Sequence, residues 1–216
     1  MADLPGGIRT LGSSIHTGDP RATDDFYATP PRATHLLTEL ECFTNPIWEP
    51  ACGKGHISEP LKSYGYEVYS TDLIDRGYGD GVLDFLAYTG QSIEGAWPGD
   101  IITNPPFTLA VPFVKRALRY VKDGGKVAMF LRTLFLESQD RFALFRVAPP
   151  RVVYVSVLRF VCAKNGDFKK IHQDGLTSGA MAYSWFVWEK GFQGDPVIKW
   201  FNTGKVRDQQ IGIMDP

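Results

Sequence analysis

A strand, a glycine turn and a helix follow one another at residues 47–64, and this unit restricts the fold more than any other part of the chain. The apolar run that begins at Ile47 reaches an acid at Glu49, and the turn Gly53-Lys54-Gly55 follows before a helical pattern at residues 57–64. Glycines permit tight turning and a close approach of backbone to a ligand. The third glycine of a dinucleotide fingerprint and the Gly-Lys-Ser/Thr of a phosphate loop are both missing, so neither of those sites is favoured.

The rest of the chain continues this alternation of apolar runs and amphipathic segments, which is typical of an α/β protein with a mostly parallel sheet. We expect seven strands, the last at 183–188, and helices that flank the sheet. The expected strands are 46–50, 67–71, 82–84, 100–103, 126–131, 152–158 and 183–188. The expected helices are 30–40, 57–64, 109–121 and 138–147.

At 216 residues the chain is most simply one folded domain. We expect a flexible N-terminal arm at 1–23, a domain at 24–190 and a C-terminal tail at 191–216. The net charge of −1 gives no indication of nucleic-acid binding, so any basic surface must be local. Three cysteines without a Cys-x-x-Cys motif disfavour a zinc site or a disulfide framework. Without a long apolar stretch or signal peptide, the expectation is a cytoplasmic protein with no membrane contact; the oligomeric state is not readable.

Acids stand at the ends of two further expected strands. Asp72 lies 19 residues after Gly53, where an acid can accept hydrogen bonds from both hydroxyls of a ribose. Asp84 is placed to accept from an adenine amine, with Phe85 against the ring. Each acid alone is more often a solvated loop charge or a helix cap than a ligand-binding group. Because ligands of open α/β sheets bind at the carboxyl ends of strands, the ordered series predicts a ligand site along that edge.

The run Asn104-Pro105-Pro106-Phe107 follows the strand expected at 100–103. Asn104 offers a side-chain carbonyl, and the two prolines fix the backbone so that the Pro105 carbonyl can be a second acceptor. Phe107 supplies a flat apolar face. Two acceptors beside an aromatic ring predict a site for a planar amine, at which the nitrogen is methylated. The alternative is a strand end and a Pro-Pro turn with Phe107 in the core.

These two motifs, together with Phe26-Tyr27-Ala28-Thr29-Pro30-Pro31, Asp72 and Asp84-Phe85, resemble those of the S-adenosylmethionine-dependent amino-methyltransferases. The resemblance is strongest to the adenine-specific DNA methyltransferases of phage and restriction systems, and it covers residues 24–190. It implies a Rossmann-like class I methyltransferase fold, S-adenosylmethionine as cofactor, a flipped adenine in DNA as substrate, and no metal. The same motifs also suit a protein glutamine or an RNA adenine, and a non-catalytic binding module of this fold is a more distant alternative.

The resemblance also implies roles for individual residues, with Thr29 a candidate ligand for the cofactor carboxylate. The implied catalytic residues are Asn104, Pro105, Pro106 and Phe107. The implied cofactor-binding residues are Tyr27, Thr29, Pro30, Glu49, Ala51, Gly53, Gly55, Asp72, Asp84 and Phe85. Phe160 is a candidate for a second stacking face on the target base, or else it closes the core.

Many enzymes of this family carry a separate recognition domain, and we expect the residues after Trp188 to be too few to form one. The segment 162–180 carries Lys164, Lys169 and Lys170, so we expect it to contact DNA. We also expect it to lie away from the cofactor, at the other end of the strand order. The alternative is an ordinary solvated hairpin loop.

Overall fold

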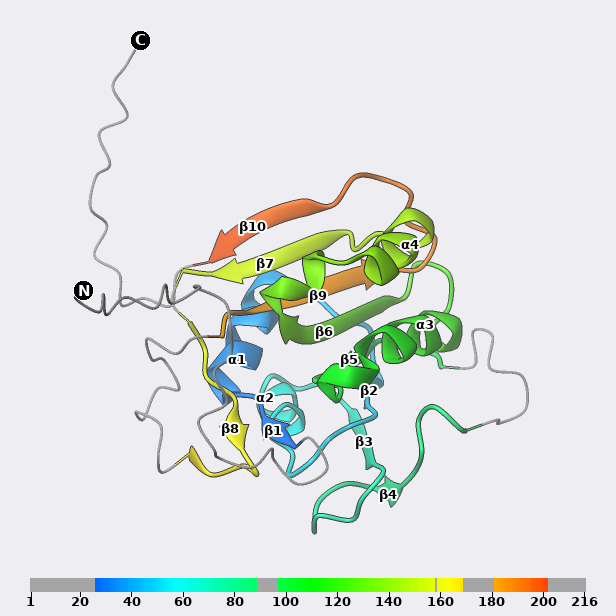
Figure 1. Ribbon diagram of the computed structural model, residues 1–216. Helices are drawn as coiled ribbons and strands as arrows, with labels where there is room; N and C mark the ends of the chain where they lie inside the picture. The colour runs from blue at the N-terminus through cyan, green and yellow to red at the C-terminus, as the bar shows by residue number, and fades with distance from the viewer. Residues whose placement is uncertain (1–25, 89–96, 158, 169–180, 202–216) are drawn as a thin grey trace, which may run out of the picture.

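The computed structural model describes residues 26–88, 97–157, 159–168 and 181–201. Its centre is an eight-stranded sheet with the order β10-β7-β9-β6-β5-β2-β3-β4 (Figure 1). All pairings in this sheet are parallel except those of β9, which runs antiparallel to both β6 and β7. The strands are β2 (Ile47–Glu49), β3 (Val68–Asp72), β4 (Gly81–Val82), β5 (Ile101–Thr103), β6 (Lys126–Arg132), β7 (Val152–Ser156), β9 (Tyr183–Glu189) and β10 (Val197–Phe201).

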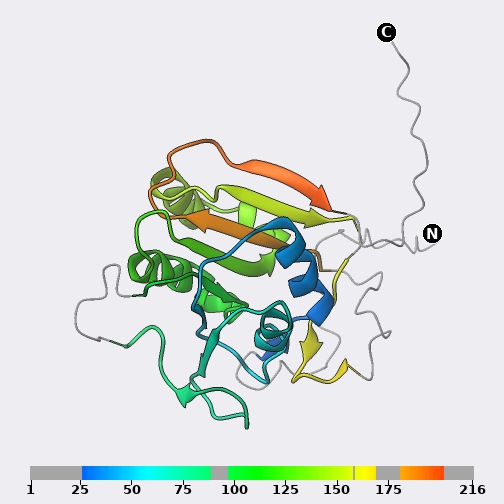
Figure 2. The same ribbon diagram turned by 180° about the vertical axis from the view of Figure 1, so that it is seen from behind.

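Helices cover both faces of this sheet (Figures 1 and 2). On one face, α1 (Pro31–Leu40) and α2 (Ser58–Ser63) bury Leu37 and Leu61 against strand residues such as Phe130. On the other, α3 (Ala110–Tyr120) and α4 (Gln139–Val147) pack against residues that alternate with the first set along the same strands. Since the middle strands are buried on both sides, they are continuous apolar runs without polar alternation. The predicted α/β architecture is confirmed.

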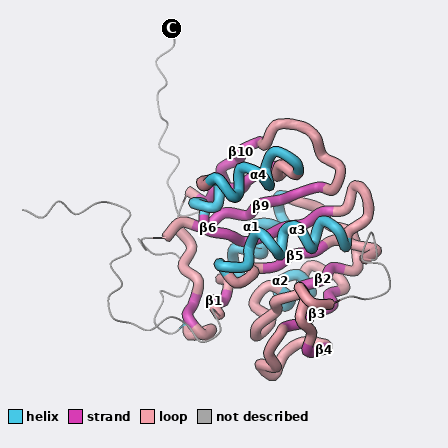
Figure 3. Tube along the Cα trace, turned by 45° about the vertical axis from the view of Figure 1, so that its right-hand side comes forward, coloured by secondary structure: helices cyan, strands magenta, loops and turns pink. Residues whose placement is uncertain are grey.

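Helices alternate with strands along the chain (Figure 3). Prolines and glycines stand at several ends of these elements. Pro31 stands in the first turn of α1, where its missing N–H would have no intrahelical partner in any case. Helix α3 ends at Tyr120, and Gly124 then turns the chain into β6 with a φ of +77°. Short 3-10 turns at Phe107–Leu109 and Thr133–Leu136 follow β5 and β6.

The prediction that 183–188 is the last strand, followed only by a tail, is wrong. Residues 197–201 form β10, which pairs in parallel with β7 and makes the sheet eight-stranded. The strand is an exposed edge, and only Phe201 is buried, where it stacks on Phe160. The first four residues of its sequence, Val-Ile-Lys-Trp-Phe, are exposed. The strand therefore lacks the buried apolar run that would distinguish it from a surface loop. The expected arm at 1–23 and the segment after Phe201 lie outside the described residues.

A second, two-stranded sheet was not predicted. Strand β1 (Tyr27–Ala28) pairs antiparallel with β8 (Ala163–Lys164), so residues about 135 positions apart lie side by side. This pair joins the segment before α1 to the segment that follows β7 (Figure 1). Among the described residues, no helix is long and apolar enough to cross a membrane, and no cluster of three His, Cys, Asp or Glu side chains is arranged to hold a metal ion.

Candidate active site

A cavity of about 400 Å³ lies at the carboxyl ends of β2, β3 and β5. This volume falls in the range of small-molecule sites, and the position is the one at which open α/β sheets bind their ligands. Most residues predicted for the site line it. They are Tyr27, Thr29, Glu49, Ala51, Asp72, Asp84, Phe85, Asn104, Pro105, Pro106 and Phe107.

Gly53 and Gly55 do not line the cavity, but they determine the shape of the turn that follows β2. Both have positive φ, +55° and +81°, which L-residues with side chains rarely adopt. A Cβ on Gly53 would lie 2.4 Å from the ring of Phe26, and one on Gly55 would lie 2.4 Å from the ring of Tyr78. The Gly53 N–H donates to Asp72 Oδ2 at 2.8 Å, which fastens the glycine turn to the end of β3. Two glycines are therefore required for this loop to close.

Glu49, the last residue of β2, is the most deeply buried acid of the cavity, with 1% of its surface exposed. Its carboxylate accepts a hydrogen bond from Ser58 Oγ, which lies 2.7 Å from Ser70 Oγ. Burial raises the pKa of Glu49 well above its usual value, and the hydrogen bond from Ser58 only partly offsets this. Burial thus favours the neutral form of this carboxyl group.

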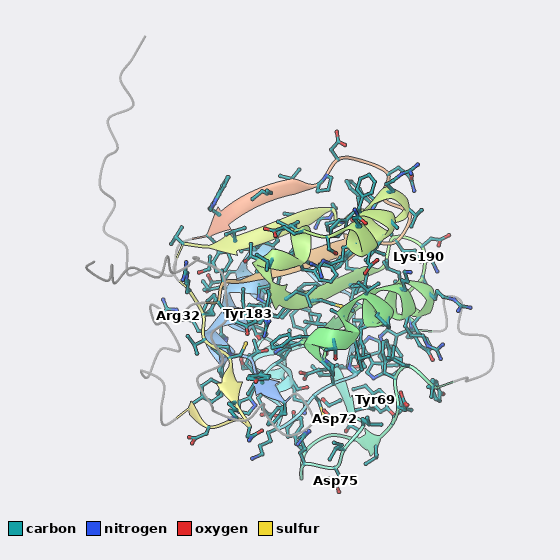
Figure 4. All side chains as sticks on the ribbon, viewed as in Figure 1. Arg32, Tyr69, Asp72, Asp75, Tyr183 and Lys190 are labelled. Atoms are coloured by element: carbon teal, nitrogen blue, oxygen red, sulfur yellow. The ribbon has the colours of Figure 1, made fainter. Side chains whose placement is uncertain are left out.

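Asp72 and Asp84 occupy the adjacent strand ends. Asp72, labelled in Figure 4 at the end of β3, accepts from the Ile74 N–H through Oδ1 at 3.0 Å as well as from Gly53. Asp84 Oδ1 accepts from the N–H groups of Leu86 and Ala87 at 2.9 and 3.1 Å. Both acids therefore have the loop-capping role considered as an alternative, and both also line the cavity. These bonds hold the carboxylates in fixed directions.

Phe85 combines a core position with a place in the cavity wall. It is 2% exposed, and its ring packs edge-on against Trp48 with centroids 5.1 Å apart. Phe113, which also lines the cavity, lies against the same ring at 5.0 Å. The aromatic wall is thus rigid and continuous with the core under α3.

The side-chain amide of Asn104 has a hydrogen-bonded –NH2 group and an oxygen without a hydrogen-bond partner. Its Nδ2 donates to the Tyr27 carbonyl oxygen at 2.8 Å and to Thr29 Oγ1 at 2.9 Å. Its Oδ1 is buried and has no hydrogen-bond partner. A buried carbonyl oxygen without a donor is uncommon and costs about 1 to 3 kcal/mol. The Asn104 side chain, which lines the cavity, therefore carries an acceptor without a donor among the described residues.

Phe107 lies beside this amide at the edge of the core. Its ring stacks on Tyr27 with centroids 5.4 Å apart and planes inclined by 30°. The guanidinium carbon of Arg132, the last residue of β6, lies 4.4 Å from the centroid of the same ring. Phe107 is thus both packed against core residues and part of the cavity wall.

The structure does not bring Phe160 to the cavity, and the prediction that it stacks on a target base is wrong. The side chain is fully buried and packs between Phe130 and Phe201, at centroid distances of 6.0 and 6.2 Å. This is the core-closing role named as its alternative. Pro30 is also outside the cavity lining; its carbonyl accepts from the Ala33 N–H at the start of α1.

The expectation that the segment 162–180 lies away from the cofactor site is also wrong for its described part. Lys164 pairs with Tyr27 across the β1–β8 ladder, and the Asn165 N–H donates to the Phe26 carbonyl at 2.9 Å. Phe168 packs against His56 with ring centroids 5.2 Å apart. This segment therefore supports the strand that lines the cavity. Lys169 and Lys170 lie outside the described residues.

Several lining residues were not predicted, among them Phe26, His56 and Arg76. The guanidinium of Arg76 lies 4.6 Å from the centre of the Phe26 ring, so the two close one side of the cavity together. Burial lowers the pKa of His56, which favours its neutral form. His56 follows the glycine turn directly and could have been found by extending that motif, whereas nothing in the sequence pairs Arg76 with Phe26.

No protein-family model matches the chain, and no curated protein matches its sequence. Among solved structures, a Listeria monocytogenes protein described as a class I S-adenosylmethionine-dependent methyltransferase is 15% identical, with a TM-score of 0.56 over 83% of this chain and 67% of the other. The methyltransferase subunit of a Streptococcus thermophilus type I restriction-modification system is 11% identical, with a TM-score of 0.55 over 85% of this chain and 48% of the other.

A Vibrio vulnificus protein described as the modification subunit of a type I restriction enzyme is 13% identical, with a TM-score of 0.51 over 82% of this chain and 47% of the other. The chain thus spans about half the length of the restriction subunits that it resembles. These likenesses are in fold rather than in sequence. Together with the sheet order and the helices on both faces, they show that this chain has the Rossmann-like fold of class I S-adenosylmethionine-dependent methyltransferases.

Proposed function

We propose that this protein transfers a methyl group from S-adenosylmethionine to the exocyclic amine of adenine in DNA. The observation that carries the proposal is the Asn104 side chain, which lines a cavity at the carboxyl edge of the sheet and whose oriented Oδ1 has no hydrogen-bond partner. An acceptor held in this way suits an –NH2 group, because an N–H of the ligand would satisfy the buried oxygen.

The cavity has side chains that suit each part of the proposed cofactor. Glu49 offers a carboxyl to an amine cation, Asp72 offers one to ribose hydroxyls, and Asp84 with Phe85 suits an adenine ring. Tyr27, Pro30, Ala51, Gly53 and Gly55 complete the proposed cofactor set. When bound, this cofactor supplies a methyl group on a sulfonium, which is already a strong electrophile.

The remaining chemistry is performed by the protein's acceptors. The lone pair of an adenine amine is delocalised into the ring, so the nitrogen is a poor nucleophile. Hydrogen bonds from the amine to Asn104 Oδ1 and the Pro105 carbonyl favour a pyramidal nitrogen and stabilise the positive charge that develops on it. Pro105 and Pro106 keep these acceptors in place because their φ angles are fixed. Once methylated, the nitrogen is cationic and strongly acidic, so it loses a proton to solvent water and a strong general base is not required. The electron pair of the broken S–CH3 bond would stay on the sulfur of the departing thioether.

Phe107 is the proposed stacking surface for the base. A base within a duplex cannot reach the cavity and would have to be flipped out, and stacking offsets part of the cost of unstacking. Tyr27 stacks on this ring and the guanidinium of Arg132 lies over it at 4.4 Å, so a base that stacks on Phe107 would take the place of Arg132. We propose that the base takes a place on Phe107 and that Lys164, Lys169 and Lys170 contact the DNA backbone.

The likeness to restriction-modification methyltransferase subunits favours DNA as the acceptor. The same acceptor pair suits a protein glutamine or an RNA adenine, and these stay the second candidates. A non-catalytic binding module of this fold is a more distant alternative, which the intact turn at 53–55, Asp72 and Asn104 disfavour.

The test is a side-by-side assay of labelled methyl transfer to DNA, RNA and protein, followed by mass spectrometry of the digested product. Wild type should produce N6-methyladenine in DNA. Asn104→Ala should lower turnover about 100- to 1000-fold, as the loss of one transition-state hydrogen bond does in other enzymes. Its cofactor affinity and melting temperature should stay close to wild type.

Asn45→Ala is the matched control, since Asn45 is an exposed amide whose Oδ1 accepts from the Glu67 N–H outside the cavity. It should keep wild-type turnover. Label that appears only in RNA or protein would reject DNA as substrate and retain the reaction class. Near-normal turnover by Asn104→Ala would remove the basis of the whole proposal.

A further inference from the structure

We propose that Thr29 is a positioning residue, which holds the Asn104 amide in the one orientation that turns its oxygen toward the substrate. This inference rests on the proposed function and adds a residue to it. Thr29 comes from a segment 75 residues before Asn104 in the sequence. In the sequence analysis its expected role was to bind the cofactor carboxylate.

The orientation of Asn104 follows from the chemistry of its two partners. The Tyr27 carbonyl at 2.8 Å can only accept a hydrogen bond, so the atom facing it must be the –NH2 group. The second N–H of the same group reaches Thr29 Oγ1 at 2.9 Å. With both donors engaged, Oδ1 has to lie on the opposite side, where it is buried and unpartnered. A flipped amide would bring two carbonyl oxygens face to face at Tyr27.

Thr29 is itself rigid, which a positioning residue has to be. It is 2% exposed, and it is followed by Pro30 and Pro31. A residue before a proline is restricted to extended backbone, so its φ and ψ have little freedom. On the other side it follows β1, whose Tyr27 and Ala28 pair with Lys164 and Ala163. The hydroxyl is therefore held at a fixed place on the wall of the cavity.

The side chain of Thr29 is the part of this arrangement that can be tested. The Tyr27 carbonyl belongs to the backbone and survives any substitution, whereas Thr29→Val removes one acceptor and keeps the side chain's shape. With one anchor left, the amide should rotate more freely and spend less time with Oδ1 toward the substrate. The loss should then fall on turnover, because the acceptor acts on the reacting amine and not on the cofactor.

The experiment compares Thr29→Val, Thr29→Ser and the control Thr34→Val. Thr34 is fully buried on α1, and its Oγ1 has no hydrogen-bond partner and is outside the cavity lining. Thr29→Val should lower kcat roughly tenfold to a hundredfold. The Kd for S-adenosylmethionine, measured by calorimetry, should change less than about threefold. Thr29→Ser should restore most of the turnover, and Thr34→Val should match wild type.

A second readout does not depend on activity. The Asn104 side-chain –NH2 signals can be assigned in ¹⁵N-labelled protein by their loss in Asn104→Ala. Their exchange with solvent should be slow in wild type and Thr29→Ser and faster in Thr29→Val. If Thr29→Val fails to fold, Thr29→Ala takes its place, since a deleted side chain at a cavity wall leaves space and no clash.

The outcomes distinguish a failure of the proposed function from a failure of the positioning role of Thr29. If wild type methylates no acceptor but Thr29→Val still frees the amide, the proposed function fails and Thr29 remains the anchor of Asn104. If Thr29→Val keeps both kcat and slow exchange, the positioning role is overturned. A Kd for S-adenosylmethionine that rises while kcat at saturation stays at the wild-type value would assign Thr29 to the cofactor instead.

Discussion

Two buried glutamates at opposite ends of the strands have opposite electrostatic environments. Glu41 directly follows α1 and lies by the amino ends of β6 and β7, and Glu49, eight residues later, ends β2 at the carboxyl edge of the sheet. They are 7% and 1% exposed. Both are carboxyl groups removed from water, yet one is surrounded by cations and hydroxyls of this chain and the other is not.

Glu41 has its charge fully compensated. It accepts from Arg151 Nη2 and from Tyr154 Oη at 2.6 Å each and from Lys126 Nζ at 2.9 Å. Burial acts to raise the pKa of Glu41, but the hydrogen bonds from Tyr154, Lys126 and Arg151 outweigh it, so that the pKa is lowered. The group joins the end of α1 to the starts of β6 and β7.

Glu49 has only Ser58 as a bonded partner, and among the described residues no Lys or Arg forms an ion pair with it. Its pKa is therefore raised by burial. The two sites therefore differ in how the carboxyl is compensated: Glu41 has two cationic partners and a phenol, and Glu49 has the hydroxyl of Ser58.

The largest effect that this comparison predicts is on stability at Glu41. Glu41→Ala leaves Arg151 and Lys126 without their shared carboxylate and Tyr154 without its acceptor. We expect a loss of about 2 to 3 kcal/mol in the free energy of unfolding at pH 7, below the range for fully buried pairs because Arg151 and Lys126 are 28% and 23% exposed. Urea unfolding measures it, and methyl transfer per folded molecule should not change.

Glu189→Ala is the matched control, because Glu189 pairs with the same Arg151 at 3.3 Å but is 37% exposed. Its loss should cost less than about 1 kcal/mol. Equal losses for the two variants would mean that burial does not distinguish these pairs, and the contrast between Glu41 and Glu49 would lose its physical basis.

The difference between the two glutamates also explains what the sequence could predict. The cavity could be predicted because short contiguous motifs determine the backbone conformation around it. These motifs are the glycines at positive φ in 53–55 and the two prolines after Asn104. The Glu41 cluster unites residues of three separate segments. Nothing near Glu41 in the sequence distinguishes it from exposed Glu39, two positions earlier.

The same limit applies to long-range contacts inside the site. Alternating apolar runs predicted the parallel sheet, since each strand carries its own pattern. The anchoring of Asn104 by Thr29, and the pairing of β1 with β8, depend on how distant segments meet, and no local pattern records that. Phe160 and β10 were misassigned for a related reason. The burial of Phe160 is completed by Phe201, which belongs to the strand that was missed.

The next effect is on cofactor affinity at Glu49. If this carboxyl receives a cationic group of S-adenosylmethionine, Glu49→Gln should weaken binding about tenfold, which corresponds to one hydrogen bond to a charged group. Because the pKa of Glu49 is raised, binding should also release a proton as the carboxyl ionises. Calorimetry in buffers of different ionisation enthalpy measures both.

The exposed Glu67, just before β3, provides the control: Glu67→Gln should bind the cofactor as wild type does. Glu49→Gln binding with unchanged affinity and unchanged proton release would make Glu49 a structural group like Glu41, and the comparison would collapse.

The smallest effect is on how stability depends on pH, and its sign should differ between the two glutamates. The stabilisation from Glu41, whose folded pKa is lowered, is present above the unfolded value of about 4.3 and is lost as the pH falls through the folded pKa. Glu49 has a raised folded pKa, so its protonated form stabilises the folded protein below about pH 4.3, and that stabilisation is lost as the pH rises through the folded pKa.

Relative to wild type, Glu41→Gln should therefore be least stable at neutral pH and recover below about pH 4. Relative to wild type, Glu49→Gln should gain stability as the pH rises from 4 to 8. Urea unfolding of the three proteins without cofactor, at several pH values, measures both curves. Parallel curves for the two variants would show that the two carboxyls share one environment and that Glu49 needs no partner from a ligand.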